Sequence, residues 1–471
     1  SHRTLSPRSA NVYLTRPTPA SRLTDLMTSR PSENAPMSVW SIAGPSIAVF
    51  MMATIAGVLI IKIVSDLGTP AVAAVTAGQR INFILVALLM GLGAATTALV
   101  SRAWGANDKV LATAYTRLAL TVGIALSVII GALMALFADQ VAAFFRLNSE
   151  AAPLATEYIR WLSLFAVSQA ISMILSTASR AIGDAKTPLY VGIIANSSAV
   201  LLAWALAYGK WGLPAMGVFG AAVGSGVAFS FSALIYLLLW MSDRLRLQFS
   251  LPADAPRTDF PRFLKVCLPA GIEQLIMQAA MLIFVWFVAQ HGTEAFAAYG
   301  VGLNLLSLTI VVGLGFSIAA SALVGQQLGA GNRQGAIDSG YRALRLAFIT
   351  MSSLGLLSVM FSREMASMLS NDPEVIELTS HFVFVLGIVH PFLAVDLVLG
   401  GAMRGAGDTR FPLMAGIISA VIVRLSLAGI ATLMALPVQW IFSIFLADQV
   451  VKCIIIWRRY EGRRWLRVLE K

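Results

Sequence analysis

The sequence predicts an all-helical integral membrane protein with twelve transmembrane helices, arranged as two six-helix parallel repeats. Three observations support this fold class. The chain of 471 residues is 58% hydrophobic and only 12% charged, which is far from the composition of soluble globular domains. Its apolar segments are long enough to cross a bilayer as helices, for which about 20 residues suffice. Its glycine and proline positions recur at one fixed distance along the chain.

Twelve apolar segments follow a polar N-terminal stretch. Their lengths, and the lack of alternation between polar and apolar residues, indicate helices rather than the strands of a barrel. A polar linker separates the first six segments from the last six. The predicted spans are 39–64, 70–100, 112–137, 154–178, 188–208, 217–241, 264–289, 295–325, 337–361, 376–402, 412–435 and 438–457.

These segments divide the chain into parts. Residues 1–36 are rich in Ser, Pro, Thr and Arg, so we expect a disordered cytoplasmic tail or residues added to the natural sequence. An N-terminal six-helix lobe is predicted over 37–242 and a cytoplasmic linker over 243–262. A C-terminal six-helix lobe is predicted over 263–457 and a basic cytoplasmic tail over 458–471.

Basic residues set the expected orientation in the membrane. With the N-terminus in the cytoplasm, the outside connections hold only Arg146, Lys210 and Arg363, and the inside connections hold the other loop arginines and lysines. The positive-inside rule therefore predicts that both termini are cytoplasmic. The net charge of +11 follows from this topology, so we expect no nucleic-acid partner.

An internal repeat organises the chain. A single shift along the chain, the one that carries Pro45 onto Pro269, superimposes its glycine and proline punctuation without a net gap. Six spans per copy is an even number, so both copies have the same orientation in the membrane. Such parallel repeats are common in transporters, with the substrate path between the halves. Further matching positions include Gly78 and Gly302, Gly91 and Gly315, Gly105 and Gly329, Arg180 and Arg404, and Gly183 and Gly407.

Two carboxylates inside predicted spans are candidates for a coupling site. Glu273 stands one turn after Pro269 in the seventh span, and Asp396 lies in the tenth. A charged side chain at the centre of a span costs about 2.5–3.5 kcal/mol, so it is a functional candidate by default. At 1.5 Å per residue, Glu273 lies about 14 Å and Asp396 about 9 Å from the cytoplasmic ends of their spans.

At comparable depth the two acids could share one cation, which suits binding Na⁺ or retaining a proton. The alternative is a structural ion pair in which Arg424 of the eleventh span neutralises one of them. The repeat positions of Glu273 and Asp396 are Val49 and Ser172, so both acids belong to one half only. The supporting polar or cavity residues that we expect beside them are Gln274, Met277, Gln278, Asn304 and Arg424.

Enzyme signatures are missing from the sequence. It contains no GxxxxGK[ST], no HExxH and no GxSxG, the motifs of P-loop ATPases, zinc proteases and hydrolases with a serine nucleophile. Cys267 and Cys453 are isolated and give no metal-binding spacing. We therefore predict that the protein is not an enzyme and has no cofactor beyond its coupling ion.

Three sequence motifs resemble the multidrug and toxic compound extrusion (MATE) family of secondary transporters. They are LVGQQLGAGN after the eighth span, AMRGAGDTRFP after the tenth and AYGVGLN at the start of the eighth. The resemblance implies two lobes across a V-shaped central cavity. It also implies export of cationic amphipathic compounds in exchange for H⁺ or Na⁺. We expect the protein to lie in a bacterial cytoplasmic membrane. We also expect it to be a monomer in contact with membrane lipid.

The chain departs from the family pattern at its acids. Many members place the seventh-span acid two turns beyond the proline, where this chain has Met277. Members with an acid in the first span have it near the position where this chain has Ile60. Because that acid is missing here, we expect no proton site in the N-terminal lobe. A lipid-linked oligosaccharide flippase of related architecture is the alternative function. A basic cavity and additional spans would favour that alternative.

Overall fold

The computed structural model describes residues 38–145, 147–248, 258–370 and 372–470. From Val39 onward, the described residues gather into one compact unit. The predicted tail over 1–36 lies outside the described residues, as does part of the predicted linker over 243–262.

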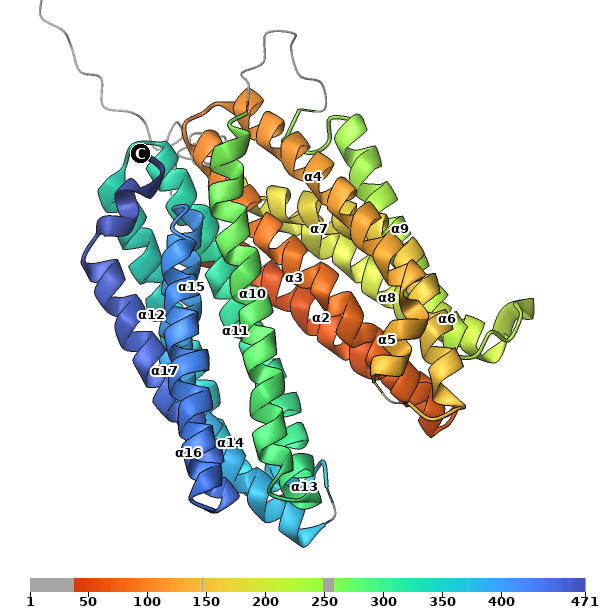
Figure 1. Cartoon of the computed structure of the whole chain (residues 1–471). Coiled ribbons are helices and arrows are strands. Elements are labelled where there is room, and N and C mark those ends of the chain that lie inside the picture. Colours follow the sequence, from red (N-terminus) through yellow and green to blue (C-terminus); the bar gives the residue numbers. More distant parts are fainter. Residues whose placement is uncertain (1–37, 146, 249–257, 371, 471) are drawn as a thin grey trace, which may run out of the picture. The chain divides into compact units, whose positions relative to one another are not determined.

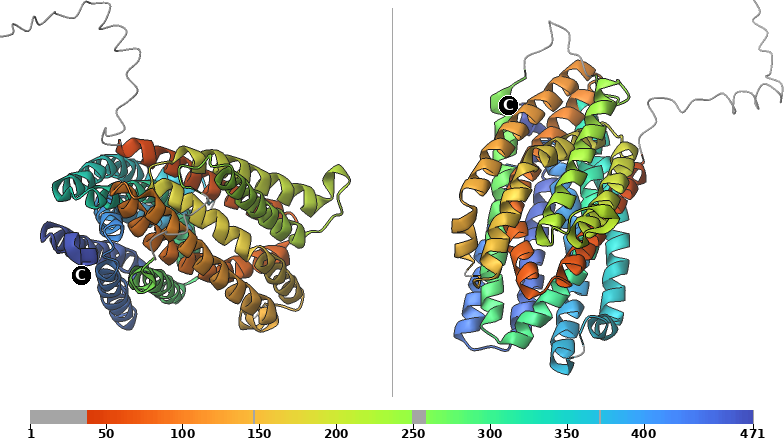
Figure 2. Two further views of the ribbon diagram at one scale, coloured as in Figure 1. Left: turned by 90° about the horizontal axis from the view of Figure 1, so that it is seen from above. Right: turned by 90° about the vertical axis from the view of Figure 1, so that its right-hand side faces the viewer.

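Helices form nearly all of this unit (Figures 1 and 2). In Figure 1 the N-terminal helices, red to yellow-green, lie beside the C-terminal helices, green to blue. The N-terminal half consists of α2 (Val39–Ser65), α3 (Thr69–Gly105), α4 (Lys109–Leu136), α5 (Ala138–Phe144), α6 (Ala151–Leu164), α7 (Ala166–Ala181), α8 (Lys186–Tyr208), η1 (Lys210–Gly212) and α9 (Val218–Met241). The C-terminal half consists of α10 (Phe260–Ala289), α11 (Thr293–Gly329), α12 (Arg333–Met360), α13 (Ser362–Ser367), α14 (Pro373–Gly405), α15 (Arg410–Gly416), η2 (Ile417–Leu425), α16 (Ser426–Leu433), α17 (Val438–Glu461) and η3 (Arg464–Glu470).

Eleven helical stretches in the described ranges are long and apolar enough to cross a membrane. The bent pair α6 and α7 supplies a twelfth candidate. This agrees with the twelve predicted spans, except that the fourth, predicted as one helix over 154–178, is broken at Phe165 with a bend of 51°. Its counterpart α14 runs through as one helix although it contains Pro391.

The repeat is visible in the helix bounds. Helix α3 runs from Thr69 to Gly105 and α11 from Thr293 to Gly329, so the shift that carries Pro45 onto Pro269 also superimposes both ends of these helices. Helices α4 and α12 are related in the same way. The positive-φ glycine before each long helix also recurs, with φ of 103° at Gly68 and 104° at Gly292. Two halves of one plan are therefore present in the backbone.

Glycines at equivalent positions of the two halves pack against aromatic side chains that are also at equivalent positions. A side chain at Gly78 of α3 would collide with the ring of Tyr158, and one at Gly302 of α11 would collide with the ring of Phe382. Tyr158 and Phe382 are themselves repeat partners. In each half, then, an aromatic residue of the fourth span packs into a glycine notch of the second.

The halves contact each other through a second set of repeated glycines. A methyl group at Gly91 of α3 would lie 2.5 Å from the backbone nitrogen of Gly271 in α10, and one at Gly315 of α11 would meet Ile47 of α2. Ile47 and Gly271 are again repeat partners. The interface between the halves therefore follows a pseudo-two-fold arrangement.

This interface extends to the C-terminal ends of α3 and α11. Gly105 packs against the backbone of Gln326, and Gly329 packs against the backbone of Arg102, leaving no room for a side chain at either glycine. We call this end of the molecule the basic end, because the connections α3–α4, α7–α8, α11–α12 and α14–α15 all lie there with their arginines and lysines.

The prediction of a separate basic tail over 458–471 is wrong, because most of these residues are helical. Arg458 lies inside α17, and η3 packs back onto the basic end. Trp465 is fully buried and stacks on Tyr460 with ring centroids 4.7 Å apart. Leu469 packs on Gly407 in the α14–α15 turn. The apolar residues interspersed among the arginines explain why this segment folds.

Candidate functional site

Glu273 is held in an ion pair by an arginine that the sequence places at a loop. The side chain of Glu273 lies on α10 one turn after Pro269 and is 2% exposed. Arg404, in the last turn of α14, donates from Nη2 to Oε1 at 2.5 Å and from Nε to Oε2 at 3.3 Å. This two-pronged geometry is the stronger form of an arginine–carboxylate pair.

Asp396 has a different cation. Its Oδ2 lies 2.9 Å from Nζ of Lys452 on α17 and accepts a hydrogen bond from Nε2 of Gln449 at 3.2 Å. All three residues are buried. The tenth and twelfth spans are therefore joined by a charge-assisted pair inside the C-terminal half.

A third buried acid, Asp448, was missed in the sequence. Arg424 does not neutralise Glu273 or Asp396; it pairs with Asp448 of α17, with Nη2 at 2.5 Å and Nε at 2.8 Å from Oδ2. The Arg424 guanidinium also lies 4.3 Å from the ring centroid of Phe445. Arg424 belongs to the π-helical segment η2, a wide helical turn that often occurs at functional sites.

The three pairs form one charge network across α10, α14, η2 and α17. Its members are Glu273, Asp396, Arg404, Arg424, Asp448 and Lys452. Three acids face three bases, so the charge network is formally neutral. Glu273 and Asp396 were expected to share one cation or to leave one of them to Arg424; instead each acid of the charge network has a basic partner of its own.

Glycine at position 400 brings two of these pairs close together. Asp396, Gly400 and Arg404 follow one another at four-residue intervals on α14, so they share a face. The Nη1 atom of Arg404 and Oδ1 of Asp396 both lie within 4 Å of the place that a side chain at Gly400 would take. Both predicted coupling acids act electrostatically on Arg404, although its ion pair is with Glu273.

One acceptor in the described part of the charge network has no partner. Among the described residues, nothing donates a hydrogen bond to Oδ1 of Asp448, which is buried. Lys452 follows Asp448 by one turn on α17 and lies within its electrostatic range. Asp448 therefore offers Lys452 a second place to bind, should Asp396 release it.

The supporting residues predicted from the sequence are only partly gathered at the charge network. Gln274, Met277 and Gln278 are half-buried on α10, and a side chain at Gly416 would meet both Met277 and Glu273. Asn304 is exposed on α11. Arg424 belongs to the network through Asp448 rather than through either predicted acid.

Two of the missed residues left a signal in the sequence. Asp448 and Lys452 are an acid and a base four residues apart within an apolar run, FLADQVVKCII, which is the spacing of an intrahelical pair. Arg404 gave a misleading signal, because it stands at the end of its span. Its long side chain extends back along the helix to reach Glu273.

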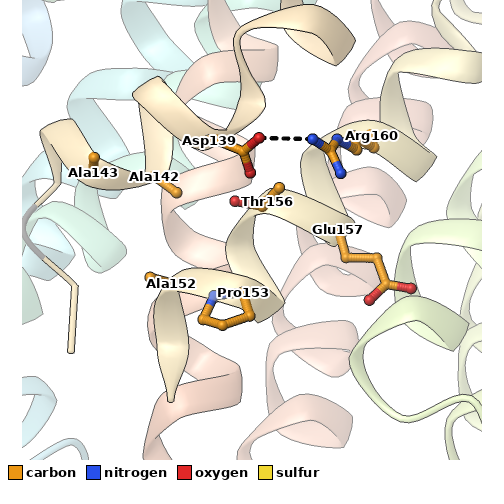
Figure 3. Close-up of a pocket in the computed structure, with 8 residues that line it drawn as sticks. All are labelled: Asp139, Ala142, Ala143, Ala152, Pro153, Thr156, Glu157 and Arg160. Carbon is orange, nitrogen blue, oxygen red and sulfur yellow. Dashed lines mark hydrogen bonds and ion pairs between the residues drawn. The ribbon is translucent and has the colours of Figure 1, made fainter. Parts of the chain in front are cut away.

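An open depression of about 640 Å³ lies elsewhere, between α5 and α6 (Figure 3). Asp139 of α5 and Arg160 of α6 line it and form an exposed ion pair at 2.8 Å. Such exposed pairs contribute little. No group of three or more His, Cys, Asp or Glu side chains suited to a metal ion occurs among the described residues. The charge network is thus the stronger candidate site.

Comparison with known proteins agrees with this architecture. The MatE family profile matches residues 45–205 and 269–430, two stretches that begin at the repeat partners Pro45 and Pro269. A probable multidrug resistance protein NorM of Thermotoga maritima is 27% identical over 349 residues, 74% of each chain. An FAD transporter of Shewanella oneidensis is 24% identical over 388 residues, 80% of this chain and 85% of its own. A crystal structure of MATE in complex with MaD3S covers 90% of this chain and 96% of its own, at 20% identity with a TM-score of 0.84.

Proposed function

We propose that this chain, which belongs to the MatE family of transporters, is a secondary antiporter that exports cationic amphipathic compounds in exchange for H⁺ or Na⁺. One observation carries the proposal: three ion pairs are buried within one half of the chain and connect four helical segments. Ionisable groups inside transmembrane helices are rare, and they typically mark substrate or ion pathways.

Coupling requires a group whose ion occupancy differs between two states, since a ligand shifts an equilibrium only by its differential affinity. Glu273 and Asp396 are the proposed groups. Because each is already paired with a base, an incoming H⁺ or Na⁺ must displace Arg404 or Lys452. The driving ion thus competes with a side chain of the protein, rather than filling an empty site.

The displaced base needs a new partner, because an unpaired buried charge is costly. For Lys452, that partner is the free Oδ1 of Asp448, one turn away on the same helix. The exchange changes the connection between α14 and α17, because Asp396 then no longer holds Lys452. Protonation or Na⁺ binding at Asp396 would in this way be converted into movement of two helices.

For the orientation, we propose that the basic end faces the cytoplasm, following the positive-inside rule. Backbone contacts at Gly105 and Gly329 close that end in this structure. The substrate path would then open toward the opposite side. In this assignment the structure represents an outward-facing state.

The test is ethidium efflux from vesicles under an imposed pH gradient or Na⁺ gradient. Glu273→Gln and Asp396→Asn should each abolish gradient-driven efflux while the protein still inserts in the membrane. Asp139→Asn is the matched control, since it removes an exposed carboxylate distant from the charge network. The gradient that drives wild-type efflux identifies the coupling ion.

A double variant separates coupling from structure. If Glu273 and Arg404 form only a structural pair, Glu273→Gln with Arg404→Gln leaves no unpaired charge and should recover efflux. If Glu273 carries the coupling ion, the double variant stays inactive even at wild-type folded yield. Recovered efflux in the double variant would remove the coupling assignment. Wild-type efflux in both Glu273→Gln and Asp396→Asn would remove it as well.

A further inference from the structure

Arg180 is a buried cation with no acid at ion-pair distance among the described residues, and its guanidinium lies 5.9 Å from the ring centroid of Phe50. It lies in the last turn of α7 and is 8% exposed. Its Nη1 donates to Ser176 at 2.7 Å and its Nη2 to Thr177 at 3.4 Å, both on its own helix. Within the described part of the chain, no carboxylate lies within ion-pair distance of Arg180, and its Nε has no hydrogen-bond partner. A desolvated charge of this kind is costly unless it is paired.

The repeat shows which partner is missing. Arg180 is equivalent to Arg404, whose partner is Glu273, and the residue equivalent to Glu273 is Val49. The equivalence holds in space: a side chain at Gly192 would lie 3.0 Å from Val49, just as one at the equivalent Gly416 would lie 3.9 Å from Glu273. The N-terminal half thus keeps the arginine and replaces its carboxylate by a hydrocarbon side chain.

Hydroxyl groups line the same face of α7. Ser168, Ser172 and Ser176 follow at four-residue intervals and lead up to the guanidinium. Ser172 lies 2.5 Å from Ser232 of α9, and Ser168 accepts a hydrogen bond from Ser230 of α9 at 3.0 Å. Hydroxyl groups can donate to an anion as well as accept. The surroundings of the guanidinium therefore include hydroxyl groups and, among the described residues, no competing carboxylate at ion-pair distance.

We propose that Arg180, with the hydroxyl of Ser176 beside it, is a binding site for an oxyanion, either a carboxylate or a phosphate group. The anion takes the role that Glu273 has in the other half and receives the free Nε–H. The group belongs either to a solute or to the headgroup of a membrane lipid. The assignment does not depend on the coupling role of Glu273 and Asp396, because it concerns the other half of the chain.

The test uses pyrenebutyrate, a fluorescent carboxylate, and pyrenebutanol, its neutral analogue, on the purified full chain. Wild type should bind pyrenebutyrate at least about tenfold more tightly than pyrenebutanol, as expected for a charge-assisted hydrogen bond. Val49→Glu copies the acid of the other half, so it should weaken pyrenebutyrate binding by about tenfold or more. Val49→Gln is the matched control of nearly equal size, and should keep the affinity within about twofold.

The melting temperatures of the same variants provide a second test. Val49→Glu should raise the melting temperature, because it pairs a buried cation, whereas Val49→Gln should not. If Val49→Glu fails to fold, Arg180→Gln should also lose the preference for the carboxylate probe, and Arg180→Lys should retain part of it. Equal binding of both probes by wild type, or an unchanged preference in Arg180→Gln, would overturn the proposal.

Lipid arms identify the source of the oxyanion. The binding experiment is repeated in nanodiscs of phosphatidylcholine alone and with phosphatidylglycerol added. Wild type and Val49→Gln should respond alike, because both keep the free guanidinium. Competition by phosphatidylglycerol in these two proteins, and none in Val49→Glu, would assign the site to a lipid phosphate. Binding that ignores phosphatidylglycerol in wild type would assign the site to a solute.

Discussion

The two halves of this chain place an arginine at the same point of the same helix and treat it in opposite ways. Arg404 is bound by Glu273 and lies near Asp396. Arg180 donates its hydrogen bonds to hydroxyls of its own helix. The backbone around both is alike, so the difference lies in side chains that the duplicated scaffold accepts at equivalent positions.

The rest of the charge network follows the same division. All members of the charge network lie in the C-terminal half. Apart from Arg404, which is equivalent to Arg180, each of them has an uncharged residue at the equivalent position of the N-terminal half. Arg424 corresponds to Val200. Helix α17 begins at Val438 and α9 at Val218, so in these last helices Asp448 and Lys452 correspond to Ala228 and Ser232. The contact of Ser172 with Ser232 accordingly repeats that of Asp396 with Lys452. By contrast, two pairs of glycines where the halves meet, Gly91 with Gly315 and Gly105 with Gly329, are kept in both. The repeat therefore preserves how helices approach one another, while the buried charges of the network are confined to one half.

The comparison is tested most strongly by removing one charge from the Arg424–Asp448 pair. Arg424→Gln leaves Asp448 buried without its cation, and breaking such a pair costs about 3–5 kcal/mol. We expect a large fall in melting temperature and in folded yield after detergent extraction. The N-terminal half shows that uncharged residues can occupy both positions. Arg424→Met with Asp448→Leu should therefore recover most of the lost stability.

The matched control is Arg180→Gln. It removes a buried arginine of the N-terminal half and leaves no unpaired acid behind. It should not lower the melting temperature. A loss in Arg180→Gln as large as that in Arg424→Gln would contradict the view that only the C-terminal half depends on paired buried charges. Failure of the double variant to recover would show that Arg424 and Asp448 have separate structural roles.

Much of the fold could be predicted from the sequence because it depends on features that are local in the chain. Apolar length predicts the spans, and glycine and proline punctuation predicts the repeat. The glycines Gly91 and Gly315 mark sites where helices pack closely, and both lie at the interface of the halves. The break at Phe165 was not predictable in this way, since α14 contains a proline at nearly the same depth and yet continues.

The site was less predictable because pairing depends on side-chain reach across helices. Glu273 and Asp396 were correctly placed inside spans, but their partners Arg404 and Lys452 were not identified. Arg404 counted as a loop residue, since the sequence gives its position along the helix and not the direction of its side chain. Whether the two acids couple transport to an ion stays a prediction.

A smaller effect should separate the two glycine contacts between the halves. Gly91→Ala would place a methyl group 2.5 Å from the backbone nitrogen of Gly271. At Gly315 the nearest atom would belong to the side chain of Ile47, and the nearest backbone atom would lie 3.1 Å away. Backbone cannot move aside as a side chain can, so we expect Gly91→Ala to cost about 1–3 kcal/mol and Gly315→Ala less. Melting temperatures in detergent measure both. Ile47→Ala should relieve Gly315→Ala only, and equal losses in the two glycine variants would indicate a strict two-fold interface.

The smallest effect concerns a feature in which the halves should behave alike. Asp108 accepts a hydrogen bond from the Leu111 amide at the start of α4, and Asn332 accepts one from the Gly335 amide at the start of α12, each at 2.8 Å. Because both side chains satisfy one free amide of a helix N-terminus, Asp108→Ala and Asn332→Ala should each cost about 1 kcal/mol. Hydrogen exchange should rise at the amide of Leu111 in the first variant and of Gly335 in the second. Exchanging the caps, as Asp108→Asn and Asn332→Asp, should change stability by no more than a few tenths of a kcal/mol, since both residues are good caps. A clear loss in only one exchanged variant would mean that the charge of Asp108 matters, and that the difference between the halves extends to the helix ends.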